Sequence, residues 1–312
     1  MADPVIVGVD DPASTGDAAD WAADEAHLRG TRLHLVHAWL WEPHQAPPSL
    51  DALRLRRAGE EALATLATRV AARHPDLEVS SGVVDSSPRE ALVALSGAAA
   101  LLVLGSRGSG GFPGLLVGST SLHVTAHAAC PVVVFRGAAS EALADDGSRG
   151  GLVVGVHGRE PCDDLLAFAF ETAQRRRLPL RAVHAWSYPL VLGPGHEFPP
   201  VYEENHVAAE ESWLLAEVMS GWREKYSEVP VVEEVVRSGP AKHLVELSET
   251  HQLVVVGRHG SAEGPFRRLG SVSQAVVHHA HCPVAVVPPG WPVGRLQLGR
   301  IEHEVTTDSP TY

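Results

Sequence analysis

Cysteine is scarce in this chain, with three among 312 residues. Cys130 and Cys282 each open a Cys-Pro-Val step at the start of an apolar run, and Cys162 stands alone. Three cysteines in these positions do not make a disulfide framework. Their usage is typical of a reduced, intracellular protein.

Long apolar runs are also missing. The longest apolar stretch, Ala91–Gly105, carries no charge but is interrupted by Ser96 and Gly97, and it is shorter than the roughly 20 residues that a transmembrane helix needs. The sequence enters a strand-like segment at Val5 without the charged and apolar regions of a signal peptide. We therefore expect no membrane partner and a cytoplasmic location.

Basic side chains are too few to cover a nucleic-acid surface. Lys and Arg number 25 against 38 Asp and Glu, which gives a net charge of −13 and an isoelectric point near 5.7. This balance disfavours nucleic acid and acidic membranes as partners and favours small ligands and proteins. The length predicts about two domains.

Common catalytic motifs are absent as well. The sequence has no Gly-x4-Gly-Lys-Ser/Thr loop, no Gly-x-Gly-x-x-Gly after its first apolar run, and no His-Glu-x-x-His or paired-cysteine zinc motif. His123 and His127 have the spacing of two metal ligands on one helix, but no third ligand is evident. We predict no metal site and assign no catalytic residue.

What the sequence does contain is an internal repeat, the feature that decides the fold when it is present. Two early segments recur at an offset of 147 residues: VIVGV at Val5 and LVVGV at Leu152, and VHAW at both Val36 and Val183. Two later segments recur at an offset of 152 residues, beginning at Pro88 and Pro240 and at Gly118 and Gly270. The second copy therefore carries about five extra residues, which we place in the loop 187–200.

Each copy alternates short Val/Ile/Leu runs with amphipathic helical segments. Continuous apolar strands between helices indicate a parallel sheet covered on both faces, and right-handed crossovers make it doubly wound. The sequence thus predicts two tandem Rossmann-like α/β domains. We place domain 1 at 1–137, a linker at 138–150, domain 2 at 151–289 and a flexible tail at 290–312.

A glycine-containing loop follows the fourth apolar run of each copy. In the first copy Gly105 and Gly108 precede Gly118 by the same spacing that separates Gly257 and Gly260 from Gly270 in the second. Glycines at the carboxyl end of a parallel strand lie where such sheets bind ligands, and they permit close backbone approach and positive φ. The helix that follows presents unpaired amides and a positive dipole end, which suit phosphate.

This Gly-x2-Gly-x9-Gly-Ser spacing, with the element order and the Cys-Pro-Val strand, resembles the universal stress protein family over roughly residues 1–289. In members of that family that bind ATP, this loop holds the phosphates. The resemblance implies ATP, with or without Mg²⁺, as the cofactor and a role as a stress-linked sensor or regulator that has a further protein partner. It also implies a homo-oligomer or an internal pseudo-dimer, in which the domains associate through their last strands, 131–135 and 283–287.

The resemblance also implies which residues bind the nucleotide. The family aspartate that faces the nucleoside matches Asp10, and the backbone that reads adenine matches Ala38 and Ala185. The expected first site comprises Asp10, Ala38, Gly105, Arg107, Gly108, Gly118, Ser119, Thr120 and Ser121. The expected second site comprises Ala185, Gly257, Gly260, Gly270, Ser271, Val272 and Ser273.

The second copy departs from the family pattern at one position, where His157 stands in place of Asp10. A neutral imidazole cannot supply a carboxylate, and a protonated one adds positive charge near the nucleotide. We therefore expect the second site to bind ATP more weakly and with pH dependence, or to be purely structural.

Two other functions stay open on the sequence alone. A slow ATPase or phosphoryl-transfer enzyme would need a metal and a placed base, for which Asp10 is the evident acidic candidate. A nucleotide-free interaction scaffold would need neither.

Overall fold

The computed structural model describes residues 2–10, 12–39, 50–106, 116–135, 150–158, 161–187, 204–258 and 269–291. The loop expected to hold the extra residues, most of the expected linker and the tail beyond residue 291 lie outside these ranges. Gly150, the last residue of the expected linker, begins a strand.

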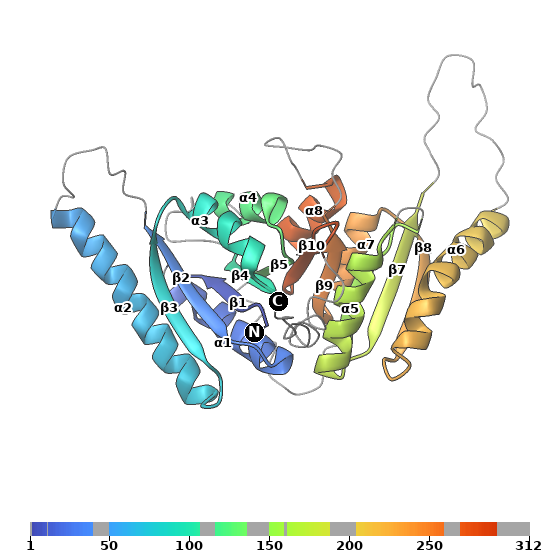
Figure 1. The fold of residues 1–312 in the computed structure, drawn as a ribbon. Helices are drawn as coiled ribbons and strands as arrows, with labels where there is room; N and C mark the ends of the chain where they lie inside the picture. The colour runs from blue at the N-terminus through green and yellow to red at the C-terminus, as the bar shows by residue number, and fades with distance from the viewer. Residues whose placement is uncertain are drawn as a thin grey trace, which may run out of the picture.

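Within these ranges, ten strands form one continuous sheet in the order β3-β2-β1-β4-β5-β10-β9-β6-β7-β8 (Figure 1). The first half contains β1 (Val5–Gly8), β2 (Leu33–Trp39), β3 (Val79–Asp85), β4 (Leu101–Gly105) and β5 (Val132–Phe135). The second half contains β6 (Gly150–Gly155), β7 (Leu180–Trp186), β8 (Val231–Arg237), β9 (His251–Gly257) and β10 (Val284–Val287). Both halves have the same strand order, so the predicted pair of doubly wound α/β repeats is confirmed.

The two halves meet at the only antiparallel pairing among these strands. Val132–Val134 of β5 pairs with Val284–Val286 of β10, whereas all other neighbours run parallel. The last strands of the repeats therefore join them into an internal pseudo-dimer, as expected. The pairing also covers two strand edges that would otherwise carry unpaired backbone groups.

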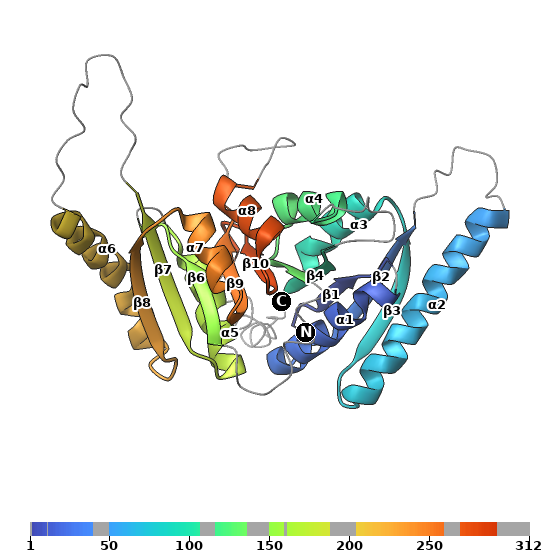
Figure 2. The ribbon, with the colours of Figure 1, turned by 180° about the vertical axis from the view of Figure 1, so that it is seen from behind.

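Helices cover both faces of the sheet, and repeat-related helices lie on the same face. The first half supplies α1 (Pro12–Arg29), α2 (Leu50–Arg73), α3 (Pro88–Leu95) and α4 (Ser119–His127); the second supplies α5 (Asp163–Arg176), α6 (Glu204–Lys225), α7 (Pro240–Leu247) and α8 (Ser271–His279). Figures 1 and 2 show α4 and α8 above the central strands and α1 and α5 below them. None of the helices in the described part of the chain has both the length and the apolarity needed to cross a bilayer.

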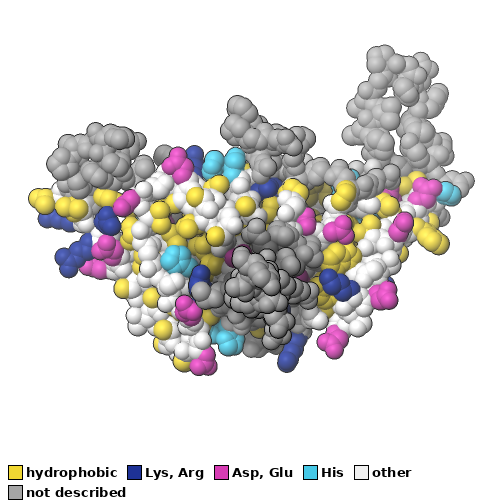
Figure 3. Space-filling view, viewed as in Figure 1, with side chains coloured by type: hydrophobic (Ala, Val, Ile, Leu, Met, Phe, Trp, Pro, Cys, Tyr) yellow, Lys and Arg dark blue, Asp and Glu magenta, His cyan; other side chains and the backbone are white. Residues whose placement is uncertain are grey.

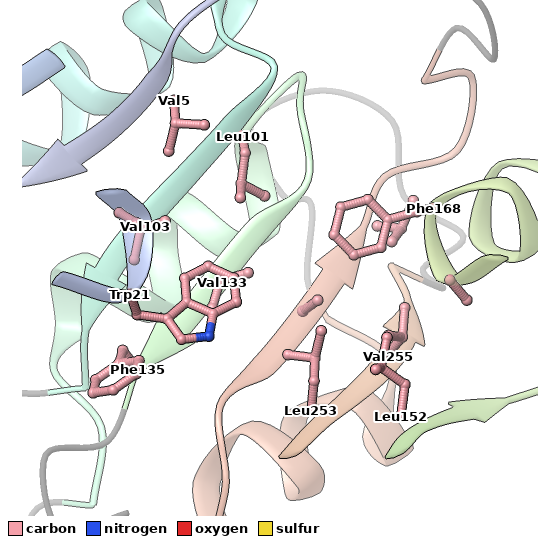
Figure 4. Packing of buried hydrophobic residues seen from close by; sticks show 14 of the residues in the cluster. Val5, Trp21, Leu101, Val103, Val133, Phe135, Leu152, Phe168, Leu253 and Val255 are labelled. Atoms are coloured by element: carbon pink, nitrogen blue, oxygen red, sulfur yellow. The ribbon is translucent and has the colours of Figure 1, made fainter. Parts of the chain in front are cut away.

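The core follows from the alternation of side chains along each strand. On the face covered by α1 and α5, one buried cluster runs across both halves and includes Val5, Val133, Leu152 and Phe168. Figure 4 shows Trp21 beside Phe135 on one side of this cluster and Phe168 on the other. The two repeats therefore share a hydrophobic core as well as a sheet.

The recurring His-Ala-Trp segment ties the ends of two strands together in each half. The ring Nδ1 of His37 donates to the carbonyl oxygen of Val9 at 2.8 Å, and that of His184 donates to Val156 at 2.9 Å. Because the carbonyls belong to the residues just after β1 and β6, each histidine fixes the backbone that leads into Asp10 or His157.

The opposite edge of the ring meets different residues in the two halves. Gly59 of α2 packs against His37 so closely that an ideal Cβ would lie 2.3 Å from ring Cδ2. At the 152-residue offset, α6 has Glu211, whose Oε2 lies 2.9 Å from Nε2 of His184. In the first half, the missing side chain of Gly59 leaves room for the imidazole. In the second half, the buried carboxylate of Glu211 contacts it instead.

Gly59→Ala is expected to destabilise the protein even though alanine is the better helix former. The added methyl group would displace a ring that the Val9 carbonyl holds in place, at a cost on the order of 1–3 kcal/mol. Gly221→Ala in α6 is the matched control, because a Cβ there meets nothing within 4 Å and the substitution should stabilise by about 1 kcal/mol. Urea unfolding of the two variants checks this, and a stabilised Gly59→Ala protein would contradict it.

A buried ion cluster joins α1 to α5 below the sheet. Glu25 accepts hydrogen bonds from Arg29 Nε at 2.6 Å and from Arg176 Nη2 and Nε at 2.7 and 3.0 Å. Burial alone would raise the pKa of Glu25, but the two guanidinium charges and their hydrogen bonds outweigh it and lower the pKa from 4.5 to about 2. The carboxylate is therefore charged in the folded protein at every pH above that value.

This depressed pKa makes Glu25 a source of acid lability. The unfolded chain takes up the proton at higher pH than the folded one, so the stabilisation is complete above pH 4.5 and is lost as pH falls towards about 2. We expect Glu25→Gln to be less stable by on the order of 3 kcal/mol at pH 6, with the difference from wild type shrinking between pH 4.5 and 2.5.

Urea unfolding across this pH range measures the effect. Glu61→Gln, which removes an exposed partner of Arg57, is the control and should track the wild-type curve. A Glu25→Gln deficit that stays constant with pH would contradict the assignment.

Candidate functional site

A pocket of about 860 Å³ opens at the carboxyl ends of the strands in the second half. Its walls come from the ends of β6, β7, β9 and β10 and from the start of α8. Ligands bind at this edge in open α/β sheets. Of the expected second-site residues, the pocket brings together Ala185, Gly257, Gly270, Ser271, Val272 and Ser273; Gly260 lies outside the described residues.

The start of α8 presents its backbone amides to this pocket. The N-cap residue Gly270 has no side chain to cap them, and Ser271 at the first helical position is exposed. The same arrangement begins α4, with Gly118 as N-cap and an exposed Ser119. A first helical turn without a side-chain cap leaves amide hydrogens and the positive dipole end for an anion.

The third helical residue makes the same contact in both repeats. Ser121 donates its hydroxyl hydrogen to the carbonyl of Gly105 at 2.8 Å, and Ser273 donates to Gly257 at 2.7 Å. Both serines are buried. Because a hydroxyl has one hydrogen to donate, these two residues use it to fasten the start of the helix to the end of the strand.

The glycines that end the fourth strands do not take positive φ. Among the described glycines, positive φ occurs at Gly30, Gly158 and Gly290, so Gly105 and Gly257 do not use this freedom of glycine, and Gly108 lies outside the described residues. The reason is that Gly105 and Gly257 are still part of β4 and β9. A Cβ on Gly257 would meet only Leu165, at 3.9 Å. Neither backbone conformation nor close packing therefore requires glycine at this position, where the residue lines the pocket.

In the first half, the described residues of the expected site occupy the equivalent positions. Asp10 follows β1 and is exposed, Ala38 lies near the end of β2, and Thr120 lies in the first turn of α4. The amide of Gly118 donates to the carbonyl of Ser106 at 2.7 Å, which holds the start of α4 beside the end of β4. Arg107 lies, like Gly108, outside the described residues.

His157 occupies the pocket wall, as its alignment with Asp10 requires. It is exposed, and the chain turns immediately after it at Gly158, whose φ is +80°. His157 therefore lines the second-half pocket at the position that Asp10 occupies in the first repeat.

The sequence did not reveal one polar pair in this pocket, His184 with Glu211. Nδ1 of His184 must carry a hydrogen to donate to the Val156 carbonyl, so the 2.9 Å contact between Nε2 and Glu211 Oε2 holds a single shared proton. Both side chains are buried. The repeat could not have indicated Glu211, because the first copy has Gly59 at that position.

Two other residues of the pocket wall, Arg258 and Cys162, have properties that the sequence did not indicate. The guanidinium of Arg258 donates to the carbonyl of Ala128 at the end of α4, so it bridges the two halves. Burial raises the pKa of the Cys162 thiol to about 11, with a further contribution from Asp163. Cys162 is therefore an uncharged thiol at neutral pH and a poor nucleophile.

The pocket has two chemically different sides. Asp164, Glu210 and Glu211 come from α5 and α6, whereas the amides and hydroxyl of Gly270 and Ser271 come from the start of α8. Apolar side chains, including Val156, Trp186 and Leu244, line the space as well. Its volume is within the usual range of small-molecule sites, and its combination of anion donors, acidic acceptors and apolar wall fits a nucleotide.

Comparisons with known proteins agree with this architecture. The sequence model of the universal stress protein family matches residues 1–136 and 151–288. A universal stress protein of Mycobacterium tuberculosis is 36% identical over 291 residues, covering 90% of this chain and 96% of its own length, and one of Mycolicibacterium smegmatis is 34% identical over 293 residues, with 91% and 97% coverage.

The fold is also found in a solved structure. The crystal structure of a universal stress protein from Archaeoglobus fulgidus superposes with a TM-score of 0.68 at 16% identity, covering 93% of this chain and 100% of that one. The two family matches and the full-length relatives establish that this chain belongs to the universal stress protein family.

Proposed function

We propose that this protein binds ATP in both of its repeats and acts as a cytoplasmic, stress-linked sensor or regulator. The observation that carries the proposal is the second-half pocket, in which the uncapped start of α8, the end of β9 and the end of β7 meet around one space. These are the positions at which the family resemblance puts phosphate and adenine.

The charges around the pocket support one orientation of the nucleotide. Phosphates would lie at the start of α8, where amide hydrogens and the helix dipole favour negative charge. The base and ribose, which offer hydrogen-bond donors, would lie towards Glu210 and Glu211 on α6. The reverse orientation would put phosphates against carboxylates and cost energy by like-charge repulsion.

Binding without fast turnover is the function that the described side chains support best. In the pocket, the buried carboxylate of Glu211 is held by His184, so it is not available as a base. Asp10 in the first half remains the candidate for hydrolysis. Metal-dependent ATP turnover that Asp10→Asn abolishes while binding persists would favour the slow-ATPase alternative over a pure binding role.

The first test is the nucleotide content and uptake of the purified protein. We expect two equivalents of adenine nucleotide per chain at saturation in calorimetry. Gly270→Val should remove the second-half equivalent and Gly118→Val the first-half one, each weakening its site at least tenfold, because a branched side chain would cover the first-turn amides.

Gly239→Val is the control for these substitutions. Gly239 is likewise an N-cap glycine, at the start of α7, and a Cβ there meets nothing within 4 Å. It should leave binding unchanged. Protein that releases no adenine nucleotide and takes up none would overturn the proposal and favour the scaffold alternative.

His157 should make the second site sensitive to pH. A protonated imidazole adds positive charge beside the nucleotide, so ATP affinity at this site is expected to rise as pH falls. Calorimetry of Gly118→Val, with only the second site open, measures this, and adding His157→Asp should flatten the dependence. A pH profile that His157→Asp leaves unchanged would assign the effect to another group.

A further inference from the structure

We propose that Glu25 is the pairing determinant of the two repeats: the α5 face of the second repeat requires a carboxylate from its partner, and the α1 face supplies it. The partner that fits the α5 face is therefore an α1-type face, and another α5-type face is excluded. This inference concerns the face below the sheet and does not depend on nucleotide binding.

The contact between α1 and α5 is built on an exchange of arginines. The guanidinium of Arg29 lies over the ring of Phe168 at 5.4 Å, and that of Arg176 lies over the ring of Trp21 at 4.7 Å. At the 147-residue offset, Trp21 corresponds to Phe168 and Arg29 to Arg176. Each repeat thus gives its arginine to the aromatic ring of the other, as in an isologous interface.

The symmetry breaks one helical turn before each arginine. Glu25 occupies that position in α1, and Thr172 occupies it in α5. Glu25 is 1% exposed and accepts from both guanidinium groups. Thr172 is equally buried, and its hydroxyl has no hydrogen-bond partner among the described residues. One carboxylate therefore serves two arginines that come from different repeats.

The cost of other pairings follows from this count of charges. Two α5-type faces would bury two copies of Arg176 with Thr172 beside them and no carboxylate from either helix position. An uncompensated buried charge costs several kcal/mol, more than the surrounding contacts return. The observed α1–α5 pairing supplies the counter-ion, and the contact of each guanidinium with the face of an aromatic ring stabilises the remaining positive charge.

The pseudo-twofold relation makes this inference testable by moving the carboxylate. Glu25→Thr removes it and leaves two arginines, so the equilibrium constant of unfolding should shift by a hundredfold or more towards the unfolded state, with the single transition splitting as the repeats uncouple. Adding Thr172→Glu puts a carboxylate at the symmetry-related position. In the double variant, the urea midpoint of unfolding should regain at least half of the decrease caused by Glu25→Thr, and unfolding should again occur in a single transition.

The control removes a neighbouring ion pair that does not cross between the repeats. Glu171 pairs with Arg175 within α5 at 3.1 Å, so Glu171→Thr should shift the unfolding equilibrium less than tenfold. Urea unfolding of the full chain, followed by near-UV circular dichroism and by the hydrodynamic radius, reads both stability and separation of the repeats.

Each outcome decides the matter. Recovery in the double variant supports the pairing role, because a merely local structural role of Glu25 would not be restored from the other helix. If Glu25→Thr is insoluble, a double variant that is soluble supports the proposal in the same way. A double variant as unstable as Glu25→Thr, or a Glu171→Thr effect of equal size, would overturn it.

Discussion

The antiparallel contact of β5 with β10 is the constraint on which the rest of the molecule depends. Because Val132–Val134 pairs with Val284–Val286, the two five-stranded halves become one sheet and are related by a pseudo-twofold axis. This brings α1 against α5 on one face and places Arg258 against the end of α4 on the other. The face in Figure 3 shows Lys and Arg interspersed with Asp and Glu, whereas Glu25, Arg29 and Arg176 at the α1–α5 contact are largely buried.

Within this shared frame, the halves differ at a few positions that are related by the repeat. Gly59 and Glu211 contact equivalent histidines, and Asp10 and His157 follow equivalent strands. Each exchange keeps the backbone and changes the chemistry next to it. The histidine still holds its strand carbonyl in both halves, whereas the charge beside the candidate nucleotide differs. The two copies therefore keep the same backbone arrangement while the side chains beside it differ.

The repeat made most of the fold predictable from sequence. The alternation of short apolar runs with amphipathic segments in each copy predicted two doubly wound α/β repeats, and both are present, because such periodicity distinguishes buried strands from the helices that cover them. The candidate site was predictable only where the backbone defines it, as at Gly257 and Gly270. Contacts of side chains distant in sequence were not: the hydrogen bond of Ser273 to Gly257, the position of Glu211 beside His184 and the reach of Arg258 to Ala128 depend on packing.

A tandem chain permits an asymmetry that two identical subunits cannot have. In a symmetric dimer, any residue at the position of Glu25 would appear twice: two carboxylates would meet two arginines, or two threonines would leave both arginines without a counter-ion. With the repeats in one chain, α1 keeps the carboxylate and α5 keeps threonine, and Glu25 alone bridges Arg29 and Arg176. The same freedom allows one repeat to carry Asp10 and the other to carry His157 at the equivalent position. Covalent linkage fixes the ratio of the two unlike halves at one to one. A buried carboxylate, or a residue of the candidate site, can therefore be present in one repeat alone while the sheet stays shared.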